Sequence, residues 1–308
     1  MLNTPTFSFS FLLPRYWINW LGIIILYTIS WLPYRLQLGL GKLIGRLLYI
    51  TVKSRRKIAA RNLEICFPEM SEQARKSLLI KNFESTGIAL FESSMGWWWP
   101  QWRIKRIAHV EGLEHLEDAL KSGQGVLLAT YHMMCLEICG RVFGQAHPCV
   151  AFYRPHNNPL MEYFQYKGRA RDNRYLIGAK NVKGLLEALT NNEACYYLPD
   201  QDYGRRRSVF VPFFAEPQAC TTTGTTLFAK ESNCKVIVLM PERLPNGKGY
   251  KITLTPALDN YPSGDDQVDA TRLNKLIEQG IMKAPEQYMW LHRRFKTRPD
   301  RKQASVYK

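Results

Sequence analysis

The sequence predicts an α/β protein in which an N-terminal membrane helix precedes a domain with a largely parallel sheet flanked by helices. Two observations carry this prediction. An uncharged apolar run occupies residues 16–32. Further along, short apolar runs typical of buried strands alternate with helical stretches. We expect strands at 125–130, 149–153, 194–198 and 235–240, an edge strand at 250–255, and helices at 133–144, 159–171, 182–190, 224–232 and 268–284.

The apolar run reads YWINWLGIIILYTISWL. At about 1.5 Å per residue, such a helix could just cross a bilayer core of about 30 Å. Only Arg15 precedes the run, whereas many Lys and Arg residues follow it between residues 35 and 61. The positive-inside rule therefore places the rest of the chain on the cytoplasmic side. We expect residues 1–35 to form a membrane anchor, either as a single pass or as a deeply embedded helix.

The remaining residues, 36–308, are expected to form one domain with two parts. Residues 36–50 are apolar around most of a helix and are interrupted by Lys42 and Arg46, which favours an amphipathic segment at a membrane surface. A solvated basic face is the alternative. Ser71 is a plausible N-cap for a helix that runs towards Trp97. We therefore expect a helical, membrane-proximal part at 36–104 and an α/β part at 105–308.

The net charge of +16 attracts nucleic acid, anionic lipid or an acidic protein. The sequence lacks zinc-finger spacing, an RNA-recognition signature and a basic zipper, and the apolar run favours lipid. We therefore expect membrane phospholipid and no nucleic acid as a partner. The seven cysteines are scattered without a C-x-x-C pair, so they are expected to be reduced thiols.

His132 and Glu137 directly follow the strand expected at 125–130. Strand ends of parallel sheets are where α/β proteins place their sites. In one helix, residues five apart would point roughly 140° apart, so the two can meet only if His132 precedes the helix. A carboxylate bonded to one imidazole nitrogen leaves the other able to take a proton from a hydroxyl. The alternative is a structural histidine beside a solvated glutamate.

Basic residues follow two further expected strands. Arg154 comes after the strand at 149–153, and the run of Arg205, Arg206 and Arg207 follows the strand at 194–198. Cations near a base can bind phosphate or stabilise an oxyanion, although the Arg run could also be a solvated loop. Cys135 is a weak candidate nucleophile, and the G-x-S-x-G elbow is missing from the sequence, so direct transfer is expected.

Several motifs resemble those of the late acyltransferases of lipid A biosynthesis, the lauroyl/myristoyl transferase family, with greatest similarity to the lauroyl-transferring enzymes. The resemblance covers nearly the whole chain. It is carried by RYW at 15–17, RNLE at 61–64, CFPEM at 66–70, NFES at 82–85, YRP at 153–155, NPL at 158–160, PD at 199–200, DYG at 202–204 and APEQYMWLHRRFKTRP at 284–299.

The resemblance implies that His132 acts as a base with Glu137 orienting it, in the family's H-x4-D/E motif, and that Arg154 and Asp200 bind substrate. It implies transfer of a fatty acyl chain, expected to be lauroyl, from an acyl carrier protein to a hydroxyl of a Kdo2-lipid IVA-type precursor at the bacterial inner membrane. No metal or diffusible cofactor is expected, because the carrier brings its own phosphopantetheine.

The chain departs from the usual lauroyl-transferase pattern around the motif, where it reads ATYHMMCLE at 129–137, and at His156 and Gln201. These changes leave acyl length and acceptor open. Two other functions also stay open. One is an acyltransferase for glycerol phosphate or another phospholipid, and the other is a nonenzymatic, basic, membrane-bound binding protein.

Overall fold

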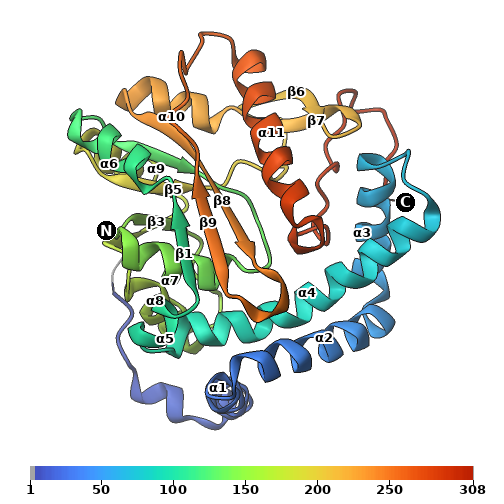
Figure 1. The fold of residues 1–308 in the computed structure, drawn as a ribbon, viewed down its shortest axis with the longest axis vertical. Coiled ribbons are helices and arrows are strands. Elements are labelled where there is room, and N and C mark those ends of the chain that lie inside the picture. The colour runs from blue at the N-terminus through green and yellow to red at the C-terminus, as the bar shows by residue number, and fades with distance from the viewer. Residues whose placement is uncertain (1–3, 308) are drawn as a thin grey trace.

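A seven-stranded sheet forms the centre of the computed structural model, which describes residues 4–307 (Figure 1). The strand order is β1-β9-β8-β2-β5-β3-β4. The strands are β1 (Ala108–Glu111), β2 (Val126–Ala129), β3 (Val150–Tyr153), β4 (Tyr175–Gly178), β5 (Ala194–Tyr197), β8 (Lys235–Arg243) and β9 (Tyr250–Leu254). A separate antiparallel hairpin pairs β6 (Ser208–Phe213) with β7 (Glu216–Thr222).

Helices surround the sheet (Figure 1). They are α1 (Trp17–Ser30), α2 (Tyr34–Thr51), α3 (Lys53–Cys66), α4 (Glu72–Trp98), α5 (Gln101–Lys105), α6 (Leu113–Lys121), α7 (Leu136–Ala146), α8 (Pro159–Ala170), α9 (Val182–Thr190), α10 (Gly224–Ser232) and α11 (Asp266–Lys283). Four short 3-10 helices are η1 (Phe9–Leu12), η2 (Pro14–Tyr16), η3 (Pro245–Gly247) and η4 (Pro285–Gln287).

The sheet is mixed, with five of its six pairs of neighbouring strands parallel. Strands β8 and β9 run antiparallel to each other, while the other neighbours in the sheet run parallel. Strand β9 was expected at an edge because its apolar and polar residues alternate. It lies instead between β8 and β1, and β1 is a strand that the sequence did not predict. A four-residue strand with only two inward side chains leaves too short a pattern to recognise.

Strand β2 lies at the centre of the hydrophobic core. All four of its residues are fully buried, because parallel neighbours, β8 and β5, flank it and helices cover both faces. Two successive residues of β5 contact helices on opposite faces of the sheet. Tyr196 packs against Phe143 of α7, whereas Tyr197 packs against Phe228 of α10. Helices α7 and α10 therefore lie on opposite faces of the sheet.

The long helix α4 packs against α2, and the two run side by side along one edge of the molecule (Figure 1). Glycines make this approach possible. A Cβ at Gly87 of α4 would collide with the backbone of Gly41 and Gly45 of α2, and a Cβ at Gly45 would collide with the backbone of Phe83 and Glu84. The two backbones are therefore in direct contact, which fixes the position of α4 against the N-terminal helices.

The predicted membrane-spanning helix over residues 16–32 is wrong. Helix α1 holds only 14 residues and ends at Ser30, before Pro33 starts the next helix, α2. At about 1.5 Å per residue, 14 residues cover about 21 Å, short of a bilayer core of about 30 Å. Among residues 4–307, no helix combines the length and the apolarity needed to cross a membrane. This finding also contradicts the expected location at the inner membrane, with a single pass or embedded helix and a catalytic domain on the cytoplasmic side.

Candidate active site

His132 lies in the turn between β2 and α7, at the carboxyl end of the central strand. The chain leaves β2 at Ala129 and enters α7 only at Leu136, so His132 precedes the helix. Two parallel strand ends meet here, because β5, the neighbour of β2, runs in register with it and ends at Tyr197. The residues that follow β5 are thereby brought beside His132.

Asp200 is the residue that β5 delivers to His132. Its Oδ1 lies 2.7 Å from Nδ1 of His132, and its Oδ2 accepts a hydrogen bond of 3.0 Å from the backbone N–H of His132. Asp200 is fully buried, whereas the His132 side chain is 20% exposed. Burial raises the pKa of Asp200, but the charge and hydrogen bonds of His132 outweigh it, so this pKa lies below its ordinary value.

This pair has a defined chemical consequence. Because Nδ1 donates to the carboxylate, the proton of the neutral ring sits on Nδ1 and the lone pair on Nε2. A buried carboxylate that holds a histidine in this tautomer is the arrangement used by general bases that activate hydroxyl groups. His132 also lines a cavity of about 910 Å³, which gives a substrate access to the ring.

Glu137, expected to orient His132, is bonded elsewhere. Its carboxylate forms an ion pair with Arg169 of α8, whose Nε lies 3.0 Å from Oε1, and it accepts a hydrogen bond of 3.4 Å from the Trp97 indole. Burial raises the pKa of Glu137, and the charge of Arg169 outweighs this effect and places it below its ordinary value. Glu137 thus joins α7 to α8 and α4, and Asp200 takes the position beside the histidine that Glu137 was expected to occupy.

The four predicted arginines divide into two groups. Arg154, Arg206 and Arg207 are exposed and line the same cavity as His132. Arg205 instead donates a hydrogen bond of 2.8 Å to the carbonyl of Pro299 and another to the carbonyl of Arg298. The first three are placed to meet an anionic ligand, and Arg205 holds the C-terminal segment.

The segment 285–292 packs against the turn that carries His132. Met289 donates its backbone N–H to the carbonyl of His132 (2.9 Å), and Met133 and Tyr288 form an isolated antiparallel bridge. Two buried asparagines hold this segment in turn. The Asn82 amide donates to the carbonyls of Glu286 and Tyr288, and the Asn62 amide donates to those of Trp290 and His292.

The cavity continues past the edge of the sheet onto both of its faces. One part, here called the α7 branch, lies between the sheet and α7 and is lined by Leu136, Gly140, Phe143, Ala151 and Tyr196. The other part, the α10 branch, lies on the opposite face and is lined by Phe152, Tyr197, Thr222, Leu227 and Phe228. His132 lies at the point where the two branches join.

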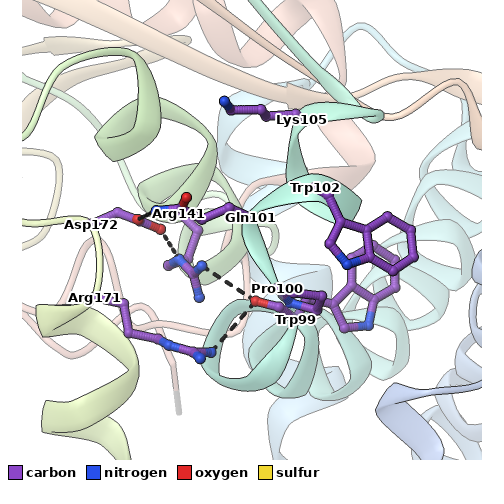
Figure 2. A pocket seen from close by; sticks show the side chains of 8 residues that line it. All are labelled: Trp99, Pro100, Gln101, Trp102, Lys105, Arg141, Arg171 and Asp172. Carbon is purple, nitrogen blue, oxygen red and sulfur yellow. Dashed lines mark hydrogen bonds and ion pairs between the residues drawn. The ribbon is translucent and has the colours of Figure 1, made fainter.

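A second cavity, of about 590 Å³, lies beyond the end of α4 (Figure 2). Three of its charged groups, Arg141, Arg171 and Asp172, are already bonded to protein. Arg141 is paired with Asp172 and also donates to the carbonyls of Gly96 and Trp99, and Arg171 donates to the carbonyl of Trp97. This cluster ties α7 to the C-terminal end of α4, so its role is structural.

The described residues offer neither a metal cluster nor an exposed thiol. Within residues 4–307, no cluster of three His, Cys, Asp or Glu side chains is placed to hold a metal ion. All seven cysteines are buried free thiols. The amide of Gly224, at the start of α10, donates a hydrogen bond of 3.1 Å to the Thr222 hydroxyl, so the first amide of this helix already has a partner.

Sequence reasoning missed two partnerships at this site. It named Asp200 as a substrate-binding residue and did not name Arg169. The link between Asp200 and His132 depends on β2 and β5 being neighbours, although the paired residues Leu128 and Tyr196 are 68 positions apart in the chain (196 − 128). Arg169 is one of the two basic residues of α8, and only the packing of α8 against α7 selects it.

Comparison with known proteins shows the family of the chain. The model of the bacterial lipid A biosynthesis acyltransferases matches residues 4–297. The lipid A biosynthesis lauroyltransferase of Escherichia coli K12 is 47% identical over 97% of this chain and 98% of its own length. The palmitoleoyltransferase of the same organism is 44% identical over 95% of each chain, and its myristoyltransferase is 30% identical over 96% of this chain and 91% of its own. The chain is thus an acyltransferase, and it belongs to the bacterial lipid A biosynthesis acyltransferase family.

Proposed function

We propose that the protein transfers a fatty acyl chain, with lauroyl as the expected chain, from acyl carrier protein to a hydroxyl of a Kdo2-lipid IVA-type precursor. The single observation that carries the proposal is the His132–Asp200 pair at the cavity. It supplies a base that lines a cavity of about 910 Å³.

The proposed step is a direct transfer. Nε2 of His132 takes the proton of the acceptor hydroxyl, and the oxygen attacks the thioester carbonyl. As the tetrahedral intermediate collapses, the bond between the carbonyl carbon and the sulfur breaks. The departing sulfur takes the proton back from His132, so the thiol of the carrier leaves and the histidine returns to its neutral form. Asp200 stays ionised and stabilises the transient imidazolium.

Charges around the cavity support the choice of substrates. Arg154, Arg206 and Arg207 line it and can bind the phosphates of a lipid A precursor. The net charge of +16 favours the approach of an acidic carrier protein and of anionic phospholipid head groups. The donor brings the phosphopantetheine arm, so the proposed reaction uses no further cofactor.

The test is transfer by the purified full chain in detergent, with lauroyl-acyl carrier protein and a tetra-acylated lipid A precursor, followed by mass spectrometry of the lipid. We expect a mass increase of one lauroyl group that is lost in His132→Ala and kept in His109→Ala, which alters an exposed histidine outside the site. Transfer to glycerol phosphate but not to the lipid A precursor would move the assignment to that acceptor. Lipid binding without transfer from any donor would indicate a binding protein.

A further inference from the structure

We propose that the α7 branch of the cavity holds the tail of the transferred acyl chain, and that Gly140 sets the longest chain that fits. This inference rests on the proposed function, because it assigns part of the cavity to the donor of that reaction. Gly140 lines the cavity, and a Cβ added to it would meet nothing within 4 Å.

The absence of a side chain at Gly140 has no packing explanation. Glycine inside a helix costs about 1 kcal/mol relative to alanine, so helical glycines are usually found where another backbone comes close. Gly144, one turn later in α7, is such a case, because a Cβ there would collide with the backbone of Asp172. What Gly140 provides instead is space inside the cavity.

Helix α7 cannot move aside to admit a larger residue. Arg141, the next residue, is buried and bonded to Asp172 and to the carbonyl of Gly96 (2.6 Å). Gly96 of α4 also lies against the backbone of Glu137. A Cβ at Gly96 would lie only 3.1 Å from the Glu137 carbonyl oxygen. A side chain introduced at position 140 would therefore enter the α7 branch rather than displace the helix.

The α7 branch runs along one face of α7. Leu136, Gly140 and Phe143 lie on successive turns of one helix face, and at about 1.5 Å per residue they extend over roughly 10 Å. At the far end the rings of Phe143 and Tyr196 pack edge to face, with 6.0 Å between their centroids. Gly140 thus lies between Leu136, at the start of α7, and the Phe143–Tyr196 ring pair.

The chemistry of the two branches separates tail from head group. The α7 branch is lined mostly by apolar side chains, among them Leu136, Phe143 and Ala151. Glu137 and Arg169 also line the cavity, and their opposite charges pair with each other. Arg207 lies beside the α10 branch, where its carbonyl accepts a hydrogen bond from the Thr223 amide (3.0 Å). An uncharged hydrocarbon tail therefore suits the α7 branch, while the phosphates of the acceptor suit the arginine side.

The test compares Gly140→Ala and Gly140→Leu with the parent on acyl carrier protein loaded with octanoyl, decanoyl, lauroyl, myristoyl or palmitoyl chains. One methylene that no longer fits an apolar pocket changes kcat/KM by about 10- to 200-fold. We expect the ratio of kcat/KM for myristoyl over decanoyl donor to fall at least about 10-fold in Gly140→Leu, and to fall less in Gly140→Ala. Gly39→Leu is the matched control, because Gly39 is an exposed helical glycine that also has nothing within 4 Å.

Binding of free fatty acids separates this inference from the proposed function. Isothermal titration calorimetry with decanoate and palmitate should show that Gly140→Leu weakens palmitate binding at least about 10-fold more than decanoate binding. A parent chain that transfers no acyl group would overturn the proposed function, while the calorimetric comparison would still decide the inference. Equal donor ratios, or equal losses of decanoate and palmitate binding, would overturn the role of Gly140.

Discussion

Asp200 accepts two hydrogen bonds from His132, one from the ring nitrogen Nδ1 at 2.7 Å and one from the backbone amide at 3.0 Å. The carboxylate therefore fixes both the rotation of the imidazole and the position of the loop that carries it. Glu137, in the same sequence motif as His132, contacts Arg169 instead.

The first prediction separates these two carboxylates. Asp200→Asn keeps the size of the side chain but can place the ring in the wrong tautomer, and the corresponding change in a serine-histidine-aspartate site lowers kcat by about 10⁴-fold. We expect a loss of about 10³- to 10⁴-fold in kcat for acyl transfer. Steady-state kinetics with the lauroyl donor would measure it, and a loss under about 10-fold would remove Asp200 from its positioning role.

Glu137 and Arg169 should behave as one unit in stability. Either Glu137→Gln or Arg169→Gln leaves a partly buried group without its partner, so each single change should destabilise the fold. The double variant should lose less than the sum of the two, with an interaction energy of about 0.5–3 kcal/mol. Urea unfolding of the four proteins gives this cycle, and strict additivity would contradict the pairing.

Acid should destabilise the protein through these same carboxylates. Asp200 and Glu137 have a lower pKa in the folded chain than in the unfolded one, where their values are about 3.9 and 4.3. Their contribution to the free energy of unfolding is therefore complete above the unfolded-state pKa values. It is lost as the pH falls through the lower folded-state pKa values. We expect the free energy of unfolding to decline below about pH 5, and to decline less steeply in Asp200→Asn. Denaturant titrations across that range would check both.

The contact between α2 and α4 gives a prediction away from the site. Gly87→Ala would force a Cβ into the backbone of Gly41 and Gly45, so it should destabilise the protein by about 1–3 kcal/mol. Gly39→Ala, at an exposed position of α2 with open space around it, should instead be neutral or stabilising by up to about 1 kcal/mol. Thermal unfolding of the two variants would give opposite shifts, and equal shifts would contradict the close packing.

Asn82 should affect activity without touching the substrate. Asn82→Ala removes hydrogen bonds of 2.9 and 2.7 Å to the carbonyls of Glu286 and Tyr288, which costs about 1–3 kcal/mol for buried groups left unpaired. The freed segment includes Met289, whose amide bonds the His132 carbonyl. Hydrogen exchange at the Met289 amide should accelerate, and kcat should fall by about 10- to 100-fold, because a small misplacement of a base is costly. Unchanged exchange would show that other contacts hold the segment.

Local pattern predicted several elements closely. The helices α9 and α10 match their expected ranges, because each has an apolar stripe and a polar start. Ser71 caps α4 through a bond of 3.2 Å from the Ala74 amide, as its residue type suggested. The expected membrane helix failed because hydrophobicity alone does not show where a helix ends, and α1 stops at Ser30 after 14 residues.

The sequence predicted only part of the site, because it indicates where strands end but not which strands are neighbours. Strand ends can be located from sequence, so the position of His132 was singled out, whereas Asp200 was named through the resemblance. Which strand lies next to which is a long-range property, and it decides that Asp200 rather than Glu137 contacts the histidine. The aromatic pair of Phe143 and Tyr196 depends on the same strand order.

The segment 285–292 has a consequence for how the protein is made. His132, Asn62 and Asn82 leave the ribosome long before residues 286–292, whose backbone groups they bind. A nascent chain can form β2 and β5 early, but the turn carrying His132 stays unsupported until residues 285–292 have emerged. Activity should therefore appear only at the end of synthesis, and a chain interrupted before residue 285 would keep its central strands and lack a working site.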